Sequence, residues 1–182
     1  APCNPEDSVL TLPWLYRFSE EICSPRHRLL CPMGEFPALA LVPEACTDLA
    51  DSRVLLMYEA IGRVMALALA HRIPLHPALP VWMARAVLEY PLTFHDLHEF
   101  SPQLFLRVES VLKHPNPEAF GLTFSEVIQR HGIVRRFEGP DGPVPVTLLN
   151  REQYATWLKG VYLNDSLETQ LKYIRQGFFF TL

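Results

Sequence analysis

The chain has 182 residues, of which 49% are hydrophobic and 20% are charged. A chain of this length and composition can bury a substantial core, and it predicts a globular protein of one domain or two small ones. Its 16 lysines and arginines stand against 20 aspartates and glutamates, which gives a formal net charge of -4 without any basic cluster. This balance argues against a surface that follows the phosphates of a nucleic acid.

The first fifty or so residues predict one helix and then a stretch without clear periodicity. We expect the helix over Leu12–Ser24, with Pro13 in its first turn and Pro25 just after its end. Its apolar face would carry Trp14, Leu15, Phe18 and Ile22. Residues 26–53 are the least readable part of the chain, and within them Glu35–Val42 fits either a short strand or an irregular packed loop.

We expect the fold to be built around the stretch Tyr58–Leu75, which predicts a helix that ends at a proline-marked turn over His71–Pro80. From Leu55 to Leu69 almost every residue is apolar or small, so both faces of the helix should be covered by other protein. Small residues repeat at every fourth position and offer a stripe where another helix could come close: Gly62, Ala66 and Ala70. Glu59 and Arg63 interrupt the apolar run, whereas a membrane span needs about 20 apolar residues. We therefore interpret the segment as a core helix and expect no membrane partner.

Capping residues and prolines divide the next forty or so residues into three further helices. Val81–Tyr90 reads as the first, with one side formed by Trp82, Ala86 and Tyr90. Thr93 and Asp96 are spaced for a reciprocal cap on a short second helix. Ser101, which is followed by a proline, begins the third helix, and the proline after His114 stops it. Its apolar stripe consists of Leu104, Val108, Val111 and Leu112.

From Phe120 the periodicity changes to short β-prone runs, which are Leu122–Ser125, Ile133–Phe137 and Pro143–Thr147. Gly-Pro-Asp-Gly at 139–142 lies between the last two runs and predicts a hairpin turn. Asn150, with Gln153 in the box position, would cap the next helix, and Asn164-Asp165 the last one, which Gly177 would end. Helices, then a small β insertion, then helices predict an α+β fold that is mostly α-helical.

Side chains that could carry an independent chemistry are few. His95 and His98 lie one helical turn apart beside Glu99, but no further ligand completes a four-ligand metal site. The four cysteines form no CxxC pair, and we expect reduced thiols in the cytosol or nucleus. The sequence holds no glycine-rich phosphate loop and no GxSxG nucleophile elbow. We therefore expect no metal and no cofactor, and an independent hydrolase has little support.

Six short motifs follow one another in an order that a known family shares. They are Ile61-Gly62-Arg63, Leu67–His71, Ile73-Pro74-Leu75, Leu122–Ser125, Val144–Thr147 with Asn150 and Tyr154, and Leu163-Asn164 through Gln170-Leu171 to Gly177-Phe178. Each motif alone is weak, but in this order and spacing the chain resembles the N-lobe of HECT-type ubiquitin ligases. The helix expected over Leu12–Ser24 also fits, so the resemblance covers nearly the whole chain. Ala66 in place of a second glycine, Ser101 in place of an aspartate and a compact Arg130–Asp141 hairpin suggest a divergent member.

The resemblance implies a division of the chain into three parts. Residues 1–100 would form a helical large subdomain, and residues 101–158 a small mixed α/β subdomain that carries a β-hairpin and the docking site. Residues 159–182 would form a helix that returns to the large subdomain.

The resemblance also implies a specific chemistry. HECT ligases take ubiquitin from a ubiquitin-conjugating enzyme onto a cysteine of a separate C-lobe, as a thioester, and pass it to a lysine of a protein substrate. None of the four cysteines here lies in a context like that catalytic one, so we expect no catalytic residue in this chain and no thioester on the fragment alone. The implied partners are a conjugating enzyme, ubiquitin through the C-lobe, and a protein substrate, in the cytoplasm or nucleus.

Carried over by position, the family's contacts with the conjugating enzyme fall on eight residues. These are Leu104, Arg107, Val108, His114, Phe120, Leu122, Thr123 and Tyr154. Leu104, Arg107 and Val108 share one helix face, and apolar pockets with aromatic walls supply much of the energy of many interfaces. The residues alone also fit the core of a small subdomain, whereas the resemblance favours a partner groove. Arg107 and His114 favour the groove, because buried positions rarely carry such residues.

The end of the chain carries three consecutive phenylalanines at residues 178–180. Exposed together they would form an apolar patch, so they either pack onto the helical body or continue into a following segment, which the resemblance favours. Three hypotheses remain: part of an active ligase, a binding module without a catalytic lobe, and a helical scaffold that shares only the fold. Binding of a conjugating enzyme would separate the first two from the third.

Overall fold

The structure is a computed structural model that describes residues 5–22, 24, 26–27, 29–32, 39–41, 49–75, 78–130 and 133–182. In chain order its elements are α1 (Pro5–Ile22), β1 (Cys31–Pro32), β2 (Leu39–Ala40), α2 (Ser52–His71), α3 (Val81–Val87), α4 (Phe94–Phe100), α5 (Pro102–Lys113), η1 (Pro117–Phe120), β3 (Ser125–Arg130), β4 (Ile133–Glu138), α6 (Arg151–Leu163), η2 (Asp165–Leu167) and α7 (Glu168–Thr181). The predicted α+β, mostly helical fold class is confirmed.

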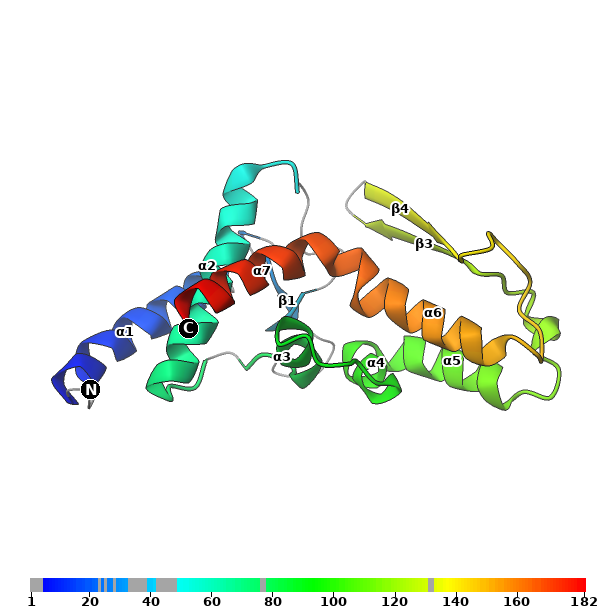
Figure 1. Cartoon of the computed structure of the whole chain (residues 1–182), viewed down its shortest axis with the longest axis horizontal. Coiled ribbons are helices and arrows are strands. Elements are labelled where there is room, and N and C mark those ends of the chain that lie inside the picture. Colours follow the sequence, from blue (N-terminus) through cyan, green and yellow to red (C-terminus); the bar gives the residue numbers. More distant parts are fainter. Residues whose placement is uncertain are drawn as a thin grey trace.

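The elements follow one another along an elongated molecule (Figure 1). Helices α1, α2 and α7 lie at one end, α3 and α4 lie in the middle, and α5, α6 and the β3–β4 hairpin lie at the other end. One cluster of buried side chains runs through both ends, from Leu29 and Tyr58 to Val108, Tyr154 and Phe178. Residues 101–158 therefore share a core with the rest of the described chain, and the three-part division of the chain stays a prediction.

Helices α2 and α7 cross at close range because a glycine lies on each side of the crossing. A Cβ atom on Gly62 would lie 2.8 Å from the backbone nitrogen of Phe178 and closer still to the carbonyl oxygen of Ile174. A Cβ atom on Gly177 would lie 3.1 Å from the backbone nitrogen of Arg63. It would also lie 2.8 Å from the carbonyl carbon of Glu59, and real Cβ atoms essentially never come within 3.0 Å of backbone atoms, so the predicted close approach at Gly62 is confirmed.

The same crossing corrects the predicted end of the last helix. Gly177 was expected to end it, but α7 continues to Thr181. A glycine inside a helix costs stability relative to alanine, and here the close approach of α2 explains its presence. Of the three phenylalanines, Phe178 packs into the core, whereas Phe179 and Phe180 are exposed, and the Arg63 guanidinium lies 5.3 Å from the centre of the Phe180 ring.

The expectation that both faces of α2 are covered is wrong within the described chain. Leu56 and Leu69 are each about 60% exposed, whereas Tyr58, Ile61 and Val64 are buried. By length and composition α2 could cross a membrane, but core helices of soluble proteins pass the same test. Its packing against α7 and its place in the central cluster agree with a core helix that has one open side.

The N-terminal part differs in detail from the prediction. Helix α1 begins at Pro5, so Pro13 lies inside it and not in its first turn. Leu15 is buried, whereas Trp14 is half exposed and stacks on Phe18 at 5.4 Å. Strand β2 falls within the segment expected to be a strand or loop and pairs with β1, while residues 35–38 and 42 lie outside the described part.

The middle helices follow their capping residues. Helix α3 ends at Val87, three residues earlier than predicted, so Tyr90 is 62% exposed and does not share the buried side of Trp82. Asp96 accepts hydrogen bonds from the backbone nitrogen and the hydroxyl of Thr93, at 2.5 and 2.8 Å, which confirms its place in the cap of α4.

The hairpin lies earlier in the chain than predicted. Strands β3 and β4 pair antiparallel from Ser125↔Glu138 to Arg130↔Ile133, so the hairpin joins these two strands, and residues 139–142 follow it. Residues 139–142 form a second tight turn, in which the amide of Gly142 donates to the carbonyl of Gly139 at 2.9 Å. This turn brings residues 144–146 back beside residues 122–124, where Thr123 and Pro145 form a β-bridge.

Candidate functional site

Helix α5 supplies three of the eight predicted contact residues. The Ser101 hydroxyl oxygen accepts from the backbone nitrogen of Leu104 at 3.3 Å and so caps the helix start, as predicted. Leu104 and Val108 point into the core, with 8% and 0% of their surface exposed. Of these three residues, which share one side of the helix, Arg107 is the one that is exposed to solvent.

Arg107 ties three elements together through a polar network. Its guanidinium pairs with the carboxylate of Glu126 on β3 and donates to the hydroxyl of Tyr154 on α6 at 3.1 Å. The hydroxyl of Tyr162 donates to the same Glu126 carboxylate at 2.8 Å. Partial burial lowers the pKa of Arg107, but the hydrogen bonds to Glu126 and Tyr154 outweigh it and hold the pKa above its ordinary value. The guanidinium is therefore always charged, and most of its donors are used inside the protein.

Tyr154 lies in the core beneath this network. Its side chain is fully buried, and its ring meets Phe124 edge-on at 5.5 Å and Trp157 at 5.8 Å. Asn150, expected to cap α6, instead holds the preceding loop, because its side chain accepts from the amide of Thr147 and donates to the carbonyl of Pro145. The aromatic cluster and this loop fix the start of α6.

The other predicted contact residues gather at the far end of the molecule. The His114 ring lies against Phe120, 4.9 Å between centres, and Phe120 is 43% exposed. The Glu118 carboxylate accepts from the amide of Leu148, which brings the turn before α6 against η1. Leu149, in that turn, is 95% exposed.

We call this region the distal surface and define it by six residues: His114, Phe120, Leu122, Thr123, Leu148 and Leu149. Leu122 and Thr123 belong to it because the amide of Val146 donates to the carbonyl of Leu122 and Thr123 bridges Pro145. The sequence analysis did not include Leu148 and Leu149 among the predicted contact residues. Two adjacent leucines between a β-run and a helix cap break both periodicities, and that break is the signal that could have found them.

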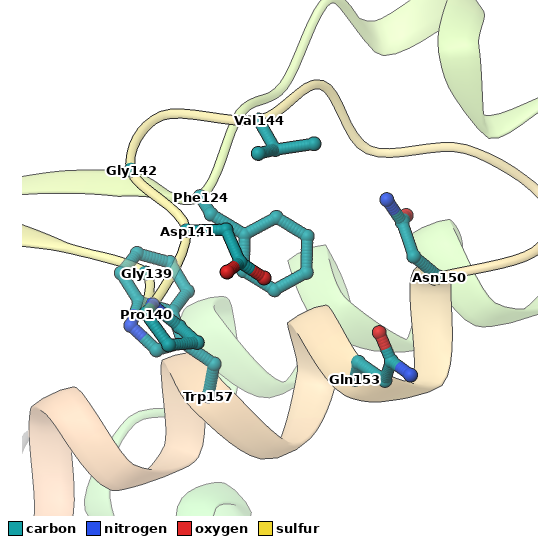
Figure 2. A pocket seen from close by; sticks show the side chains of 9 residues that line it. All are labelled: Phe124, Gly139, Pro140, Asp141, Gly142, Val144, Asn150, Gln153 and Trp157. Atoms are coloured by element: carbon teal, nitrogen blue, oxygen red, sulfur yellow. The ribbon is translucent and has the colours of Figure 1, made fainter.

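A pocket of about 390 Å³ opens beside this surface, between the 139–142 turn and α6. Figure 2 shows the ring of Phe124 at its back, Trp157 on α6 at one side, and the carboxylate of Asp141 and the amide of Gln153 at its edge. Phe124 and Trp157 lie 5.5 Å apart, between ring centres. The pocket therefore combines an aromatic wall with one carboxylate.

The structure thus divides the eight predicted residues by depth. Four of them lie together on the distal surface: His114, Phe120, Leu122 and Thr123. Arg107 lies near the middle of α5, beside β3. Leu104, Val108 and Tyr154 lie in the core, where a partner does not reach them in this conformation.

A family profile matches most of the sequence. The profile of the HECT-domain (ubiquitin-transferase) family matches residues 16–182. The chain belongs to the HECT-domain family. A search of curated proteins returned no match. Membership of this family places the chain among the ubiquitin transferases and agrees with the resemblance drawn from the motifs.

Within the described part of the HECT chain, no group of three histidines, cysteines or acidic residues is placed to hold a metal ion. Glu99, beside His95 and His98, is used otherwise, since its carboxylate accepts from the backbone nitrogens of Val81 and Trp82, each at 3.1 Å. It caps α3 in place of a residue at the helix start, because Pro80 has no side-chain donor or acceptor to offer.

Proposed function

We propose that this HECT chain docks a ubiquitin-conjugating enzyme on the distal surface. Ubiquitin would pass from that enzyme to a cysteine in a separate C-lobe and then to a lysine of a protein substrate, in the cytoplasm or nucleus. The observation that carries the proposal is the HECT family match together with the exposed apolar residues at the end of α5.

The physical case rests on where exposed apolar side chains gather. Phe120, Leu148 and Leu149 are all exposed, and η1 and the adjoining turn hold them in place through the Glu118–Leu148 hydrogen bond. A fixed apolar surface with an aromatic anchor loses little conformational freedom on binding, which favours affinity. In this proposal Leu104, Val108 and Tyr154 support the surface from beneath, and Arg107 holds α5, β3 and α6 in register.

The test is a titration of a panel of ubiquitin-conjugating enzymes into the isotope-labelled chain, followed by NMR. We expect saturable shifts with at least one enzyme, and an affinity that Phe120→Ala lowers about tenfold or more, as is typical of an interface anchor. Tyr90→Ala is the matched control, because it also removes an exposed aromatic ring, three residues after the end of α3 and outside the residues that define the distal surface. Equal loss in both variants, or no binding by any enzyme of the panel, would refute the proposal.

The chain alone is proposed to form no ubiquitin thioester. A conjugating enzyme charged with ubiquitin, mixed with the chain, should leave no band on the chain that a thiol reductant removes. Such a band would show that one of its own cysteines accepts ubiquitin.

A further inference from the structure

The pocket beside the distal surface is built by a turn that the backbone holds in one shape. The amide of Gly139 donates to the carbonyl of Phe124 at 2.8 Å, and the amide of Phe124 donates to the carbonyl of Val144 at 2.9 Å. A Cβ atom on Gly139 would lie 2.8 Å from the Cβ of Phe124, and Gly142 has a φ of +80°. Both glycines are therefore needed for the turn to lie on the phenylalanine ring. Asp141 is carried at the tip of this turn.

The charge that the side chains lining the pocket carry is negative only. Of its nine lining residues, Asp141 alone is ionisable, and none is cationic. Within the part of the chain that the structure describes, no hydrogen bond or ion pair occupies the Asp141 carboxylate or the Gln153 amide. Both groups are free to bind a ligand at the edge of an aromatic wall (Figure 2).

An aromatic wall beside a carboxylate suits a cationic side chain with an apolar stem. The stem packs on the rings of Phe124 and Trp157, and the cation is attracted both by their π-faces and by the Asp141 carboxylate. A guanidinium suits the site best, because it can stack on a ring while its N–H groups donate to a carboxylate or to an amide oxygen. A purely apolar side chain would displace water from the exposed Asp141 and Gln153 side chains without replacing its hydrogen bonds.

The pocket is continuous with the distal surface. Phe124 directly follows Leu122 and Thr123, and Val144, on the pocket's wall, directly precedes the segment that bridges Thr123. A partner seated on the distal surface therefore reaches the pocket with a neighbouring side chain.

From these observations we infer that the pocket is a specificity slot for an arginine or lysine side chain of the docked ubiquitin-conjugating enzyme. The inference rests on the proposed function, because it names the chemistry by which the same interface would choose among conjugating enzymes. Enzymes with a cationic residue at this point would bind, and those with an acidic residue there would be repelled by Asp141.

The first experiment tests the slot without the enzyme. N-acetyl-arginine methylamide is titrated into the labelled chain, and the indole N–H signal of Trp157 and the amide signal of Asp141 are followed. N-acetyl-citrulline methylamide is the matched probe, because it has nearly the same shape without the charge. We expect the arginine probe to bind about fivefold more tightly than the citrulline probe, and this difference to vanish in Asp141→Asn. It should persist in Glu138→Gln, which removes an exposed carboxylate from β4 outside the pocket.

Equal affinities for the two probes, or a charge preference that Asp141→Asn leaves intact, would overturn the slot. The second experiment repeats the conjugating-enzyme titration with the same two variants. We expect Asp141→Asn to weaken binding about threefold to fivefold and Glu138→Gln to leave it unchanged. Binding that is equal in both variants would overturn the inference while the docking proposal stands. Absence of binding by every conjugating enzyme would overturn the docking proposal and, with it, the partner assigned to the slot.

Discussion

The crossing of α2 and α7 allows a prediction in which the same substitution has opposite effects at different sites. Replacing Gly62 by alanine adds a Cβ atom 2.8 Å from the carbonyl carbon of Ile174 and the nitrogen of Phe178. Ordinary contacts between such atoms are about 3.5 Å or longer, and the carbonyl oxygen of Ile174 would lie closer still, so α2 and α7 must separate by more than about 0.7 Å. These neighbours are backbone atoms of a helix and cannot turn aside as a side chain could.

The net change in the free energy of unfolding caused by Gly62→Ala follows from two opposing effects. Forcing an extra carbon into a packed interface costs about 1–3 kcal/mol, and the rigid neighbours place this site near the upper value. Alanine in place of glycine inside a helix returns about 1 kcal/mol. We therefore expect Gly62→Ala to lower the free energy of unfolding by about 2 kcal/mol and the melting temperature by about 4–8 °C. Gly177→Ala should act similarly, and the double variant should cost less than the sum, because the helices have already separated.

Gly160 on α6 is the matched control, because a Cβ atom there has no heavy atom from other parts of the protein within 4 Å. Gly160→Ala should raise the free energy of unfolding by about 0.5–1 kcal/mol through helix propensity alone. Urea denaturation of the variants, followed by circular dichroism, measures the differences. If Gly62→Ala stabilised the protein as Gly160→Ala does, the close approach of the two helices would be refuted.

Two further predictions concern buried charge. Arg107→Ala leaves the nearly buried Glu126 carboxylate without its cation, so it should lower the free energy of unfolding by about 2 kcal/mol. In a double-mutant cycle measured by urea denaturation, Arg107→Ala combined with Glu126→Ala should cost less than the sum of the two single variants. Strict additivity would contradict the network. Burial raises the pKa of Asp96, but hydrogen bonds from Thr93 and the pairing with Arg85 outweigh it and hold the pKa below its ordinary value of 3.8. The resulting stabilisation is complete above that ordinary value and is lost as the pH falls through the lower pKa of the folded state. In an acid titration, Asp96→Asn should therefore lose less stability below about pH 4 than the wild type does. Identical slopes of the free energy of unfolding against pH would contradict the assignment.

Local signals in the sequence predicted most elements, and failures occurred where a distant element decides. Ser101 and Asp96 cap their helices as expected because a cap needs only neighbours three residues away. Gly177 resembles a helix end by itself, and only the approach of Gly62, more than a hundred residues earlier, explains why α7 continues through it. The turn signal at residues 139–142 was correct as a turn but was assigned to the wrong pair of strands, because turn residues do not specify which strands they connect.

Prediction of the candidate site was limited in the same way, by contacts between residues that are distant in sequence. Arg107 suggested an open groove because arginine rarely lies at a buried position, yet its partners Glu126 and Tyr154 lie 19 and 47 residues away in sequence. Without the fold, an arginine that binds a partner and one that joins internal elements look alike. Asp141 was noted only as a turn residue, since its pocket exists only when α6 lies beside the turn.

The central claim, that a conjugating enzyme docks on the distal surface, is tested most directly by mapping the contact. In a methyl cross-saturation experiment on the complex, irradiation of the enzyme should attenuate the methyl signals of Leu122, Leu148 and Leu149. The signals of Leu56 and Leu69, which are exposed on the open side of α2, should keep their intensity and serve as the internal control. Attenuation confined to Leu56 and Leu69 would contradict the account and place the partner on the α2 face.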